Sequence, residues 1–376
     1  MISLYIHVPL CISKCRYCGF YSTAYSPDIA DEFISGLRQE AALYRDDFSR
    51  RSFSTIYLGG GTPTTLSPNQ LGVLTGIVRD HFLMDDGIEF TVEANPKTVT
   101  NEKLSCLIEN GVNRLSLGIQ SFSDEILETL GRLHTGRQAA DAFRLARTAG
   151  FANIGVDLIY GIPGQTVDNW EETLRAAISL GPDHVSVYSL SFDEGSQFKK
   201  EADAGGTVLP EEEIAADMYG IAVQKLYDAG YGRYEISNFA LPGCECRHNM
   251  NYWNRGEYLG LGPGAWSFIS AKRRANIADI VKYSQTLSSG RMAADFEEIL
   301  DKETASRETV LLTLRTMKGV DLLRFGREFG EDRLNRLKQH AVLLREAGLI
   351  RMTAARMELT DRGIMLSNEA LTRLCE

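Results

Sequence analysis

Hydrophobic and polar positions follow two different periods along the first half of the chain. Short apolar runs of the kind that forms buried strands occur at residues 2–8, 54–58, 88–93, 113–118, 153–159 and 184–190. Segments with helical spacing of apolar residues follow them, near residues 27–47, 67–83, 100–109, 137–149 and 167–180. The pattern therefore predicts a series of six βα units.

Strands that alternate with helices in this way form a parallel sheet, because the chain needs a crossover helix to return to the same end of the sheet. Six units are too few for a complete barrel of the eight-stranded TIM type. We therefore predict an α/β fold with a partial, three-quarter barrel. Its functional site is expected at the carboxyl ends of the strands.

The pattern changes in the second half of the chain. A Gly-, Asp- and Glu-rich loop, a long helix near 211–229 and a Gly- and aromatic-rich stretch follow the last predicted strand. From about residue 303 helical spacing returns and leads into a strand, a turn, a second strand and a short helix. We predict a barrel domain at 1–195, a barrel extension at 196–300 and a winged-helix-like α+β domain at 301–376.

Composition and charge narrow the class of protein. The 376 residues are 44% hydrophobic and 24% charged, as in a folded soluble protein. The net charge of -10 argues against binding to nucleic-acid phosphates. No apolar run reaches the roughly 18 residues of a membrane span, and no signal segment precedes the first motif. We expect a cytoplasmic protein without a transmembrane segment, which is compatible with peripheral membrane contact.

Three of the seven cysteines lie in the segment CISKCRYC, at Cys11, Cys15 and Cys18. An odd, crowded set does not look like paired disulfides. Thiolates that converge in a tight loop suit an iron–sulfur site or zinc. A structural zinc site usually needs a fourth protein ligand. Three cysteines instead leave one metal corner free for a substrate.

Polar and glycine motifs occur at the ends of the next predicted strands. The run GGGTPT at 59–64 contains glycines that allow a ligand to approach the backbone closely. The later strand ends supply further polar groups: the carboxylates of Glu93 and Asp157, the amide of Gln120 and the guanidinium of Arg132. Each of these alone is equally typical of a turn, a helix cap or a polar strand end. Together they predict a ring of ligand-binding groups.

The CxxxCxxC motif after the first strand of a βα-repeat chain resembles that of the radical S-adenosylmethionine (SAM) enzymes. The resemblance implies a [4Fe-4S] cluster on the three cysteines, with SAM bound to the open iron and cleaved by one electron. It also implies that Gly60, Gly61 and Thr62 bind the methionine amino group. Glu93 would accept hydrogen bonds from the ribose, and Gln120 and Arg132 would contact the cofactor's carboxylate.

Further residues are assigned to this site through the same resemblance. Asp157 would complete the ring of polar groups from the fifth strand. Tyr5 and Tyr17 flank the cysteines, and they would pack beside the cluster or the adenine, or else serve as core aromatics. Within the superfamily, SLYIHVPLC, LGIQSF, GRLH and DLIYGIPGQT are similar to the coproporphyrinogen dehydrogenase group of porphyrin-related proteins.

The segment HNMNYW at 248–253 resembles the HNxxYW pattern of the HemW family of heme chaperones in this group. Imidazole is a natural ligand for heme iron, which makes His248 the candidate heme ligand. Tyr252 and Trp253 would stack on the porphyrin. The alternative is a packed core histidine with aromatic neighbours. The resemblance implies a chaperone that transfers heme to acceptor hemoproteins such as respiratory cytochromes, compatible with a homodimer and with no enzymatic turnover.

Three rival functions remain open at this point. An oxygen-independent coproporphyrinogen III dehydrogenase is disfavoured because relatives of that kind carry an amino-terminal arm and a further cysteine where this chain has Phe20. A heme-degrading radical SAM methyltransferase of the same group would destroy the heme spectrum. A winged-helix DNA-binding regulator is disfavoured by the acidic charge.

Overall fold

The computed structural model describes residues 2–375 and contains a curved sheet of twelve strands. Six of its strands lie side by side in chain order and run parallel to one another. They are β1 (Ile2–Val8), β4 (Ser52–Gly60), β5 (Leu83–Ala94), β6 (Arg114–Gln120), β7 (Asn153–Tyr160) and β8 (His184–Ser189). These are the six strands that the hydrophobic pattern predicted, and the predicted fold class is confirmed.

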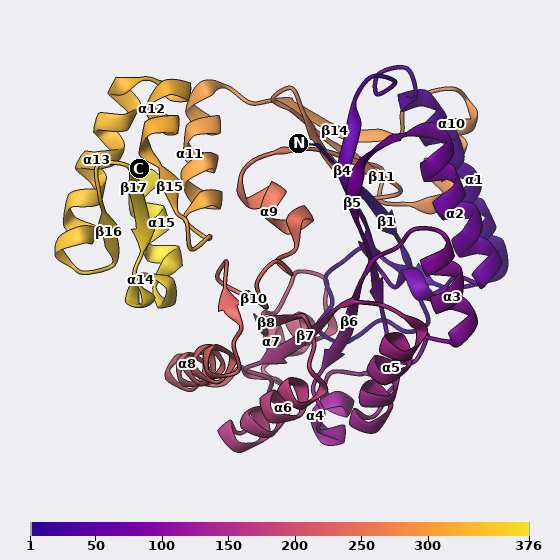
Figure 1. Cartoon of the computed structure of the whole chain (residues 1–376), viewed down its shortest axis with the longest axis horizontal. Helices are drawn as coiled ribbons and strands as arrows, with labels where there is room; N and C mark the ends of the chain where they lie inside the picture. The colour runs from indigo at the N-terminus through magenta and orange to yellow at the C-terminus, as the bar shows by residue number, and fades with distance from the viewer. Residues whose placement is uncertain (1, 376) are drawn as a thin grey trace.

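Helices cover the convex face of this sheet (Figure 1). They are α1 (Pro27–Tyr44), α2 (Pro68–His81), α3 (Asn101–Glu109), α5 (Gly136–Ala149) and α6 (Val167–Leu180). Each begins directly after a Ser or Thr whose side chain accepts a hydrogen bond from the first turn of the helix. Such capping satisfies backbone N–H groups that have no partner within the helix. The chain therefore switches from strand to helix at defined points.

The strands present two different faces. Leu4, Ile6 and Val8 of β1 are completely buried in the core between sheet and helices. The residues that alternate with them point into the concave side, where Tyr5 and His7 contact each other. Alternation of side chains along a strand produces this division. The concave side is accordingly polar and aromatic.

The sheet does not close into a complete barrel, because its order runs from β14 at one edge to β9 at the other. β11 (Glu257–Leu261) adds a further parallel strand beside β1, and β12 (Trp266–Ile269), β13 (Lys272–Asn276) and β14 (Ala294–Ile299) continue antiparallel. At the other edge β10 (Asn238–Ala240) and β9 (Gly232–Arg233) follow β8. The proposed divisions at residues 195 and 300 fall after β8 and β14. The sequence did not predict β11 as a strand of the parallel series, since its five residues include a glycine and a glutamate.

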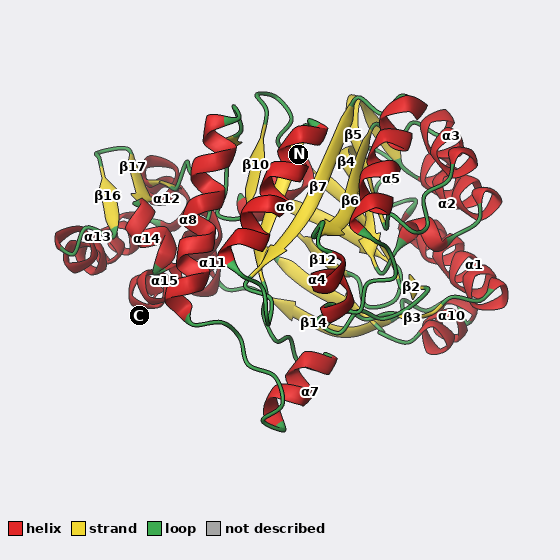
Figure 2. Ribbon diagram, turned by 90° about the horizontal axis from the view of Figure 1, so that it is seen from below, coloured by secondary structure: helices red, strands yellow, loops and turns green. Residues whose placement is uncertain are grey.

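Residues 2–300 contain eight further elements. They are β2 (Leu10–Cys11), β3 (Thr23–Ala24), a 3-10 turn at Pro63–Thr65, α4 (Asp124–Thr129), α7 (Gln197–Asp203), α8 (Glu212–Asp228), α9 (Arg247–Trp253) and α10 (Ile280–Ser288). Helix α7 projects away from the body of the molecule (Figure 2). No helix among residues 2–375 is both long and apolar enough to cross a bilayer.

The C-terminal residues form a separate layer at the open side of the barrel, beyond α9 (Figure 1). They comprise α11 (Lys302–Thr313), β15 (Val320–Asp321), α12 (Leu322–Phe329), α13 (Glu331–Glu346), β16 (Ile350–Met352), β17 (Arg356–Leu359), α14 (Asp361–Met365) and α15 (Ser367–Cys375). The three strands pair in the order β15-β17-β16. Helices followed by a small hairpin are the order expected for the winged-helix-like domain.

Candidate functional site

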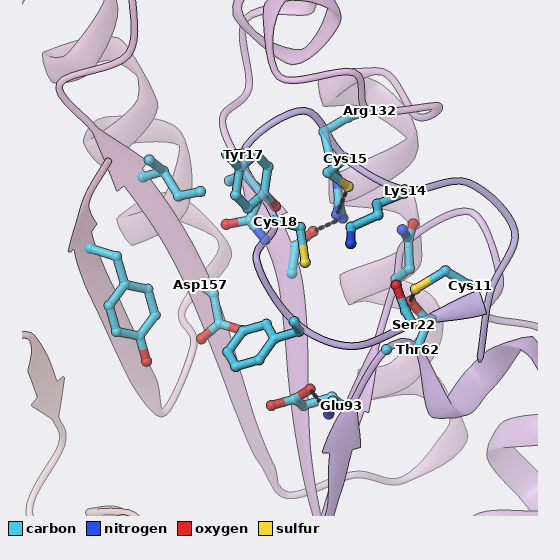
Figure 3. Close-up of a pocket in the computed structure, with 18 of the residues that line it drawn as sticks. Cys11, Lys14, Cys15, Tyr17, Cys18, Ser22, Thr62, Glu93, Arg132 and Asp157 are labelled. Atoms are coloured by element: carbon cyan, nitrogen blue, oxygen red, sulfur yellow. Dashed lines mark hydrogen bonds between the residues drawn. The ribbon is translucent and has the colours of Figure 1, made fainter. Parts of the chain in front are cut away.

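A cavity of about 480 Å³ lies at the carboxyl ends of the parallel strands, and we name it the cluster cavity. Apart from Tyr5 and His248, every residue that the sequence predicted for the cofactor site lines this cavity. These are Cys11, Cys15, Tyr17, Cys18, Gly60, Gly61, Thr62, Glu93, Gln120, Arg132 and Asp157. Figure 3 shows the cysteine loop on one side and Glu93 and Asp157 on the strands. Residues that lie far apart in the sequence, from Cys11 to Asp157, therefore meet in one place.

The cysteine loop is fastened at its ends and in its middle. β2, which ends at Cys11, pairs with β3 beyond the loop. The backbone N–H of Arg16 donates to the carbonyl of Leu130 at 3.1 Å. The Arg16 guanidinium donates to Glu201 at 2.6 Å and lies over the ring of Phe198. These contacts hold the loop in position before any metal binds, as a metal site requires.

The three thiols lie in different surroundings. Cys11 Sγ lies 3.6 Å from Thr62 Oγ1, and Cys15 Sγ accepts a hydrogen bond from Arg132 Nη1 at 3.4 Å. Burial raises the pKa values of Cys11 and Cys18 above the ordinary thiol value. Thiolates are the form that binds metal. Metal binding at this loop would therefore release protons.

The residues present fit an iron–sulfur cluster. Three soft thiols line one cavity, and thiolates are the usual ligands of such clusters. Among residues 2–375, no three Cys, His, Asp or Glu side chains gather closely enough to hold a single metal ion. A mononuclear zinc site would need its ligands to converge on one point at about 2.0–2.3 Å.

Glu93 is fixed at the floor of the cluster cavity. Its Oε1 accepts a hydrogen bond from the Tyr57 hydroxyl at 2.8 Å, and its Oε2 accepts one from the Gly60 N–H at 3.2 Å. Burial raises the pKa of Glu93 to about 7, opposed by the hydrogen bond from Tyr57. Gly60 has a φ of +102°, and a side chain there would collide with the His7 ring. Glycine is thus required at this position by both backbone and space.

Two predicted residues present unused polar atoms beside the cavity. Gln120 is 8% exposed, adopts a φ of +69°, and its Oε1 has no hydrogen-bond partner in the described part of the chain. The Nε of Arg132 is likewise without a partner there, although Nη2 donates to the Gly118 carbonyl at 2.5 Å. Buried polar groups normally have partners. An acceptor and a donor left free at a cavity fit a polar ligand such as SAM.

Asp157 and Tyr17 line the cluster cavity, whereas the other predicted tyrosine, Tyr5, does not. Asp157 accepts hydrogen bonds from Ser116 Oγ at 3.2 and 3.3 Å, and burial raises its pKa. Tyr17 lines the cluster cavity. Tyr5 does not; its hydroxyl contacts His7 Nδ1 at 3.0 Å, and both residues line a second cavity. Tyr17 therefore stays a candidate for the cofactor site, whereas Tyr5 meets the cavity lining through Tyr57, at 6.3 Å between ring centroids.

Comparison with known proteins agrees with this geometry. The Radical SAM superfamily model matches residues 5–177, and the HemN C-terminal domain model matches residues 300–366. A protein named heme chaperone HemW from Bacillus subtilis is 37% identical over 98% of this chain and 98% of its own length. One of the same name from Mycobacterium tuberculosis H37Rv is 34% identical over 99% and 94%. The chain belongs to the HemW family of radical SAM proteins.

A solved structure extends the similarity to the whole fold. The coproporphyrinogen III oxidase HemN from Escherichia coli, described as a radical SAM enzyme, superposes with a TM-score of 0.87 at 25% identity. The match covers 99% of this chain and 89% of that one. The HemW-family chain therefore shares both its barrel and its C-terminal layer with HemN.

The family segment around His248 is buried inside the barrel. Glu89 of β5 accepts hydrogen bonds from the backbone N–H groups of Arg247 and His248, each at 2.9 Å, and so fixes the start of α9. His248 is 1% exposed. Its Nδ1 contacts Thr55 Oγ1 at 2.8 Å and its Nε2 contacts the Tyr252 hydroxyl at 2.9 Å. Burial lowers the pKa of His248 to about 3.

This arrangement differs from the expected heme ligand. A ligating imidazole needs one ring nitrogen free to face the iron, and both nitrogens of His248 already have partners. In the conformation described, His248 instead ties α9 to β4. The geometry therefore argues against direct ligation by His248, which would require the Tyr252 hydroxyl to move away.

A second cavity, which the sequence did not predict, lies on the other side of Phe20, and we name it the aromatic groove. Its volume is about 660 Å³. Half of its lining residues are aromatic, and two guanidinium groups and one carboxylate join them: Tyr5, His7, Phe20, Tyr21, Tyr252, Tyr258, Trp266, Phe268, Arg255, Arg273 and Glu308. Of the family segment, Tyr252 reaches this groove. Phe20 lines both cavities.

Sequence reasoning also missed functional neighbours within the cluster cavity. Tyr57 lines it and holds Glu93. Its position on the concave face could have been inferred, because Tyr57 lies between Ile56 and Leu58 of β4, whose side chains are buried in the core, and successive side chains of a strand point to opposite faces. No motif marked Tyr57 itself. Alternation along a predicted strand was the available signal.

Proposed function

We propose that this HemW-family protein is a heme chaperone that binds heme and passes it to acceptor hemoproteins such as respiratory cytochromes. One observation carries the proposal: the match to a protein named heme chaperone HemW extends over 98% of both chains. The match includes the barrel, its extension and the C-terminal layer. The rival decarboxylase assignment is disfavoured by Phe20, because an apolar ring at that position offers no ligand.

The cluster cavity would hold the cofactors that the radical SAM family implies. Cys11, Cys15 and Cys18 would bind a [4Fe-4S] cluster, which supplies one electron when reduced. Gly60 and Gly61 would let SAM approach the backbone. Glu93 would accept hydrogen bonds, and the free donor of Arg132 would bind a carboxylate. The remaining polar contacts would come from Thr62, Gln120 and Asp157.

We place this activity in the cytoplasm. The cluster requires three reduced thiols, and glutathione keeps thiols reduced in that compartment. The cysteines that the structure describes are all free, which agrees with a reducing environment. The acceptor would be a hemoprotein that meets the chaperone there or at the membrane surface, and a homodimer is compatible with this role.

Heme binding and transfer test the proposal. The protein is reconstituted anaerobically with iron and sulfide and titrated with heme while the Soret band is recorded. We expect saturable binding, followed by transfer of the band to an added apocytochrome. In parallel, the reconstituted protein is supplied with SAM, reductant and coproporphyrinogen. Heme binding without conversion of coproporphyrinogen supports the chaperone.

Two results would contradict this function. Decarboxylated product without heme binding would restore the enzymatic alternative. Loss of the heme spectrum on addition of SAM and reductant would instead favour the heme-degrading methyltransferase.

His248→Ala is included as a variant. Because His248 is buried, we expect it to lower thermal stability whether or not heme is present.

A further inference from the structure

The aromatic groove lies outside the proposed cofactor site. It is bordered by the end of the cysteine loop, by residues of β11, β12 and β13 and by helix α11 of the C-terminal layer. A volume of about 660 Å³ is within the usual range for small-molecule sites. The groove is therefore large enough for a ligand of the size of a cofactor.

The walls of the groove suit a flat, apolar ligand. Tyr252 and Tyr258 meet edge to face at 4.6 Å between ring centroids, and Phe268 continues the same wall. Phe20 and Trp266 are 63% and 46% exposed. Large apolar side chains left open at a cavity are typical of ligand or partner sites. Rings of this kind bind other rings by stacking or by edge contacts.

Arg255 is held in the groove with donors unused. Its φ of +52° is a backbone conformation that residues with a Cβ rarely adopt. Its Nε has no hydrogen-bond acceptor in the described residues, because Glu308 lies 3.7 Å away and Glu328 lies 3.6 Å from Nη1. Those separations exceed normal hydrogen-bond lengths. The guanidinium carbon lies 5.1 Å above the Phe268 ring.

Arg273 provides a contrast within the same groove. Its guanidinium donates directly to Glu298 at 2.7 Å and to Glu308 at 2.5 Å. Arg273 therefore makes direct hydrogen bonds to two carboxylates, whereas Arg255 has only the two longer ion pairs with Glu308 and Glu328. Strained residues that the surrounding fold maintains occur preferentially at functional sites. Arg255, whose ion pairs with Glu308 and Glu328 are longer than hydrogen bonds, is thus positioned to donate to an anionic group of a ligand that lies against the aromatic wall.

We propose that the aromatic groove binds heme, with the porphyrin against the aromatic wall and a propionate carboxylate on Arg255. Heme combines a flat apolar ring with two carboxylates, which are the two properties that this groove recognises. The inference rests on the proposed function, since it places the heme of the chaperone. It also assigns Tyr252 of the family segment to the ligand and leaves His248 as its support.

A double comparison tests this assignment. Heme and heme dimethyl ester are each titrated, by Soret absorbance, into the anaerobically reconstituted wild type and the Arg255→Gln variant. The wild type should bind heme about tenfold more tightly than the ester, the effect of one charge-assisted hydrogen bond. In Arg255→Gln, heme should bind about tenfold more weakly, and the preference for heme over the ester should fall by the same factor.

Two further variants serve as controls. Arg255→Lys keeps the charge but lacks the planar fork, so we expect an intermediate affinity for heme. Arg351→Gln makes the same substitution on β16, where the side chain is 74% exposed, and should leave both titrations unchanged. The ester titration on wild type needs no variant to fold.

The outcomes separate this inference from the proposed function. If the wild type binds heme tightly and neither esterification nor Arg255→Gln changes the affinity, the groove assignment is overturned and the proposed chaperone function still stands. Failure of the wild type to bind heme at all would overturn both. A preference for heme that depends on Arg255 would support both.

Discussion

The two cavities of this protein adjoin each other but differ in the chemistry that they offer. The cluster cavity presents thiols, carboxylates, an amide and a guanidinium. The aromatic groove presents rings, two guanidiniums and one carboxylate. The first suits a metal cluster and a polar, zwitterionic ligand, and the second suits a flat ligand with carboxylates. With the ligands proposed above, one fold would separate the handling of SAM from the handling of heme.

Removal of a cysteine ligand is the strongest test of this separation. We expect Cys15→Ala to abolish the iron content and visible absorbance of the reconstituted cluster, because three thiolates are the complete set of ligands that this loop supplies. Heme affinity should change less than about threefold, since Cys15 does not line the groove. Cys106→Ala, on α3, is the matched control and should retain the cluster. Loss of heme binding together with the cluster would show that the cavities are one site.

The pH dependence of stability compares a buried carboxyl behind the groove with one in the cluster cavity. Glu40 accepts hydrogen bonds from the Gly262 N–H, the Asn276 amide and the Tyr283 hydroxyl. Burial raises its pKa from 4.5 to about 7, although these bonds oppose the shift. Burial likewise raises the pKa of Glu93 to about 7. A carboxyl whose pKa is higher in the folded than in the unfolded protein stabilises the fold at pH values below its unfolded pKa. This contribution is lost as the pH rises through the folded pKa, which is about 7 for Glu40.

The free energy of unfolding should therefore fall between pH 4.5 and about 7, by roughly 3 kcal/mol for Glu40. In Glu40→Gln this part of the decrease should disappear, leaving the part due to Glu93. Chemical denaturation at several pH values measures both. An unchanged slope in the variant would mean that Glu40 ionises normally in the folded protein.

Gly60→Ala should disturb both cavities at once. Gly60 lines the cluster cavity, and its added methyl group would meet the ring of His7, which lines the groove. The collision adds to the strain of a φ of +102°, so we expect a loss of about 2 kcal/mol or more in stability. Gly87→Ala has a φ of +72° in open space and should cost only about 1 kcal/mol. Equal melting temperatures would contradict the collision.

Glu93→Gln should give the smallest and most local effect. The amide retains one acceptor oxygen but has lost the negative charge, so SAM should bind about tenfold more weakly. Heme affinity should not change, because Glu93 does not line the groove. Equilibrium binding of SAM to the reconstituted protein provides the measurement. A matching loss of heme affinity would be evidence against two sites.

The cluster cavity could be predicted from the sequence because parallel strands bring successive strand ends together. Gly60, Glu93, Gln120 and Asp157 come from four neighbouring strands, β4, β5, β6 and β7. The continuous apolar runs identified those strands, and the helical spacing of apolar residues identified the helices between them. The order along the chain was therefore also the order in space.

The aromatic groove could not be predicted in the same way. It depends on the pairing of β1 with β11, in which Ile2 lies beside Glu257, and on α11 at the open side of the barrel. No local pattern encodes such a distant register. The burial of His248 could not be predicted either, because a histidine among aromatic residues has the same sequence pattern whether it ligates iron or packs in a core.

The position of Phe20 has a consequence for how the two ligands communicate. One side chain borders both cavities, so a ligand that displaced this ring from one side would alter the free energy of binding on the other, if SAM and heme occupy the two cavities as proposed. Thermodynamic reciprocity then requires that SAM change heme affinity by the same factor by which heme changes SAM affinity. The cofactor would thus act as an effector of the cargo, and the cargo as an effector of the cofactor, without any chemical reaction between them.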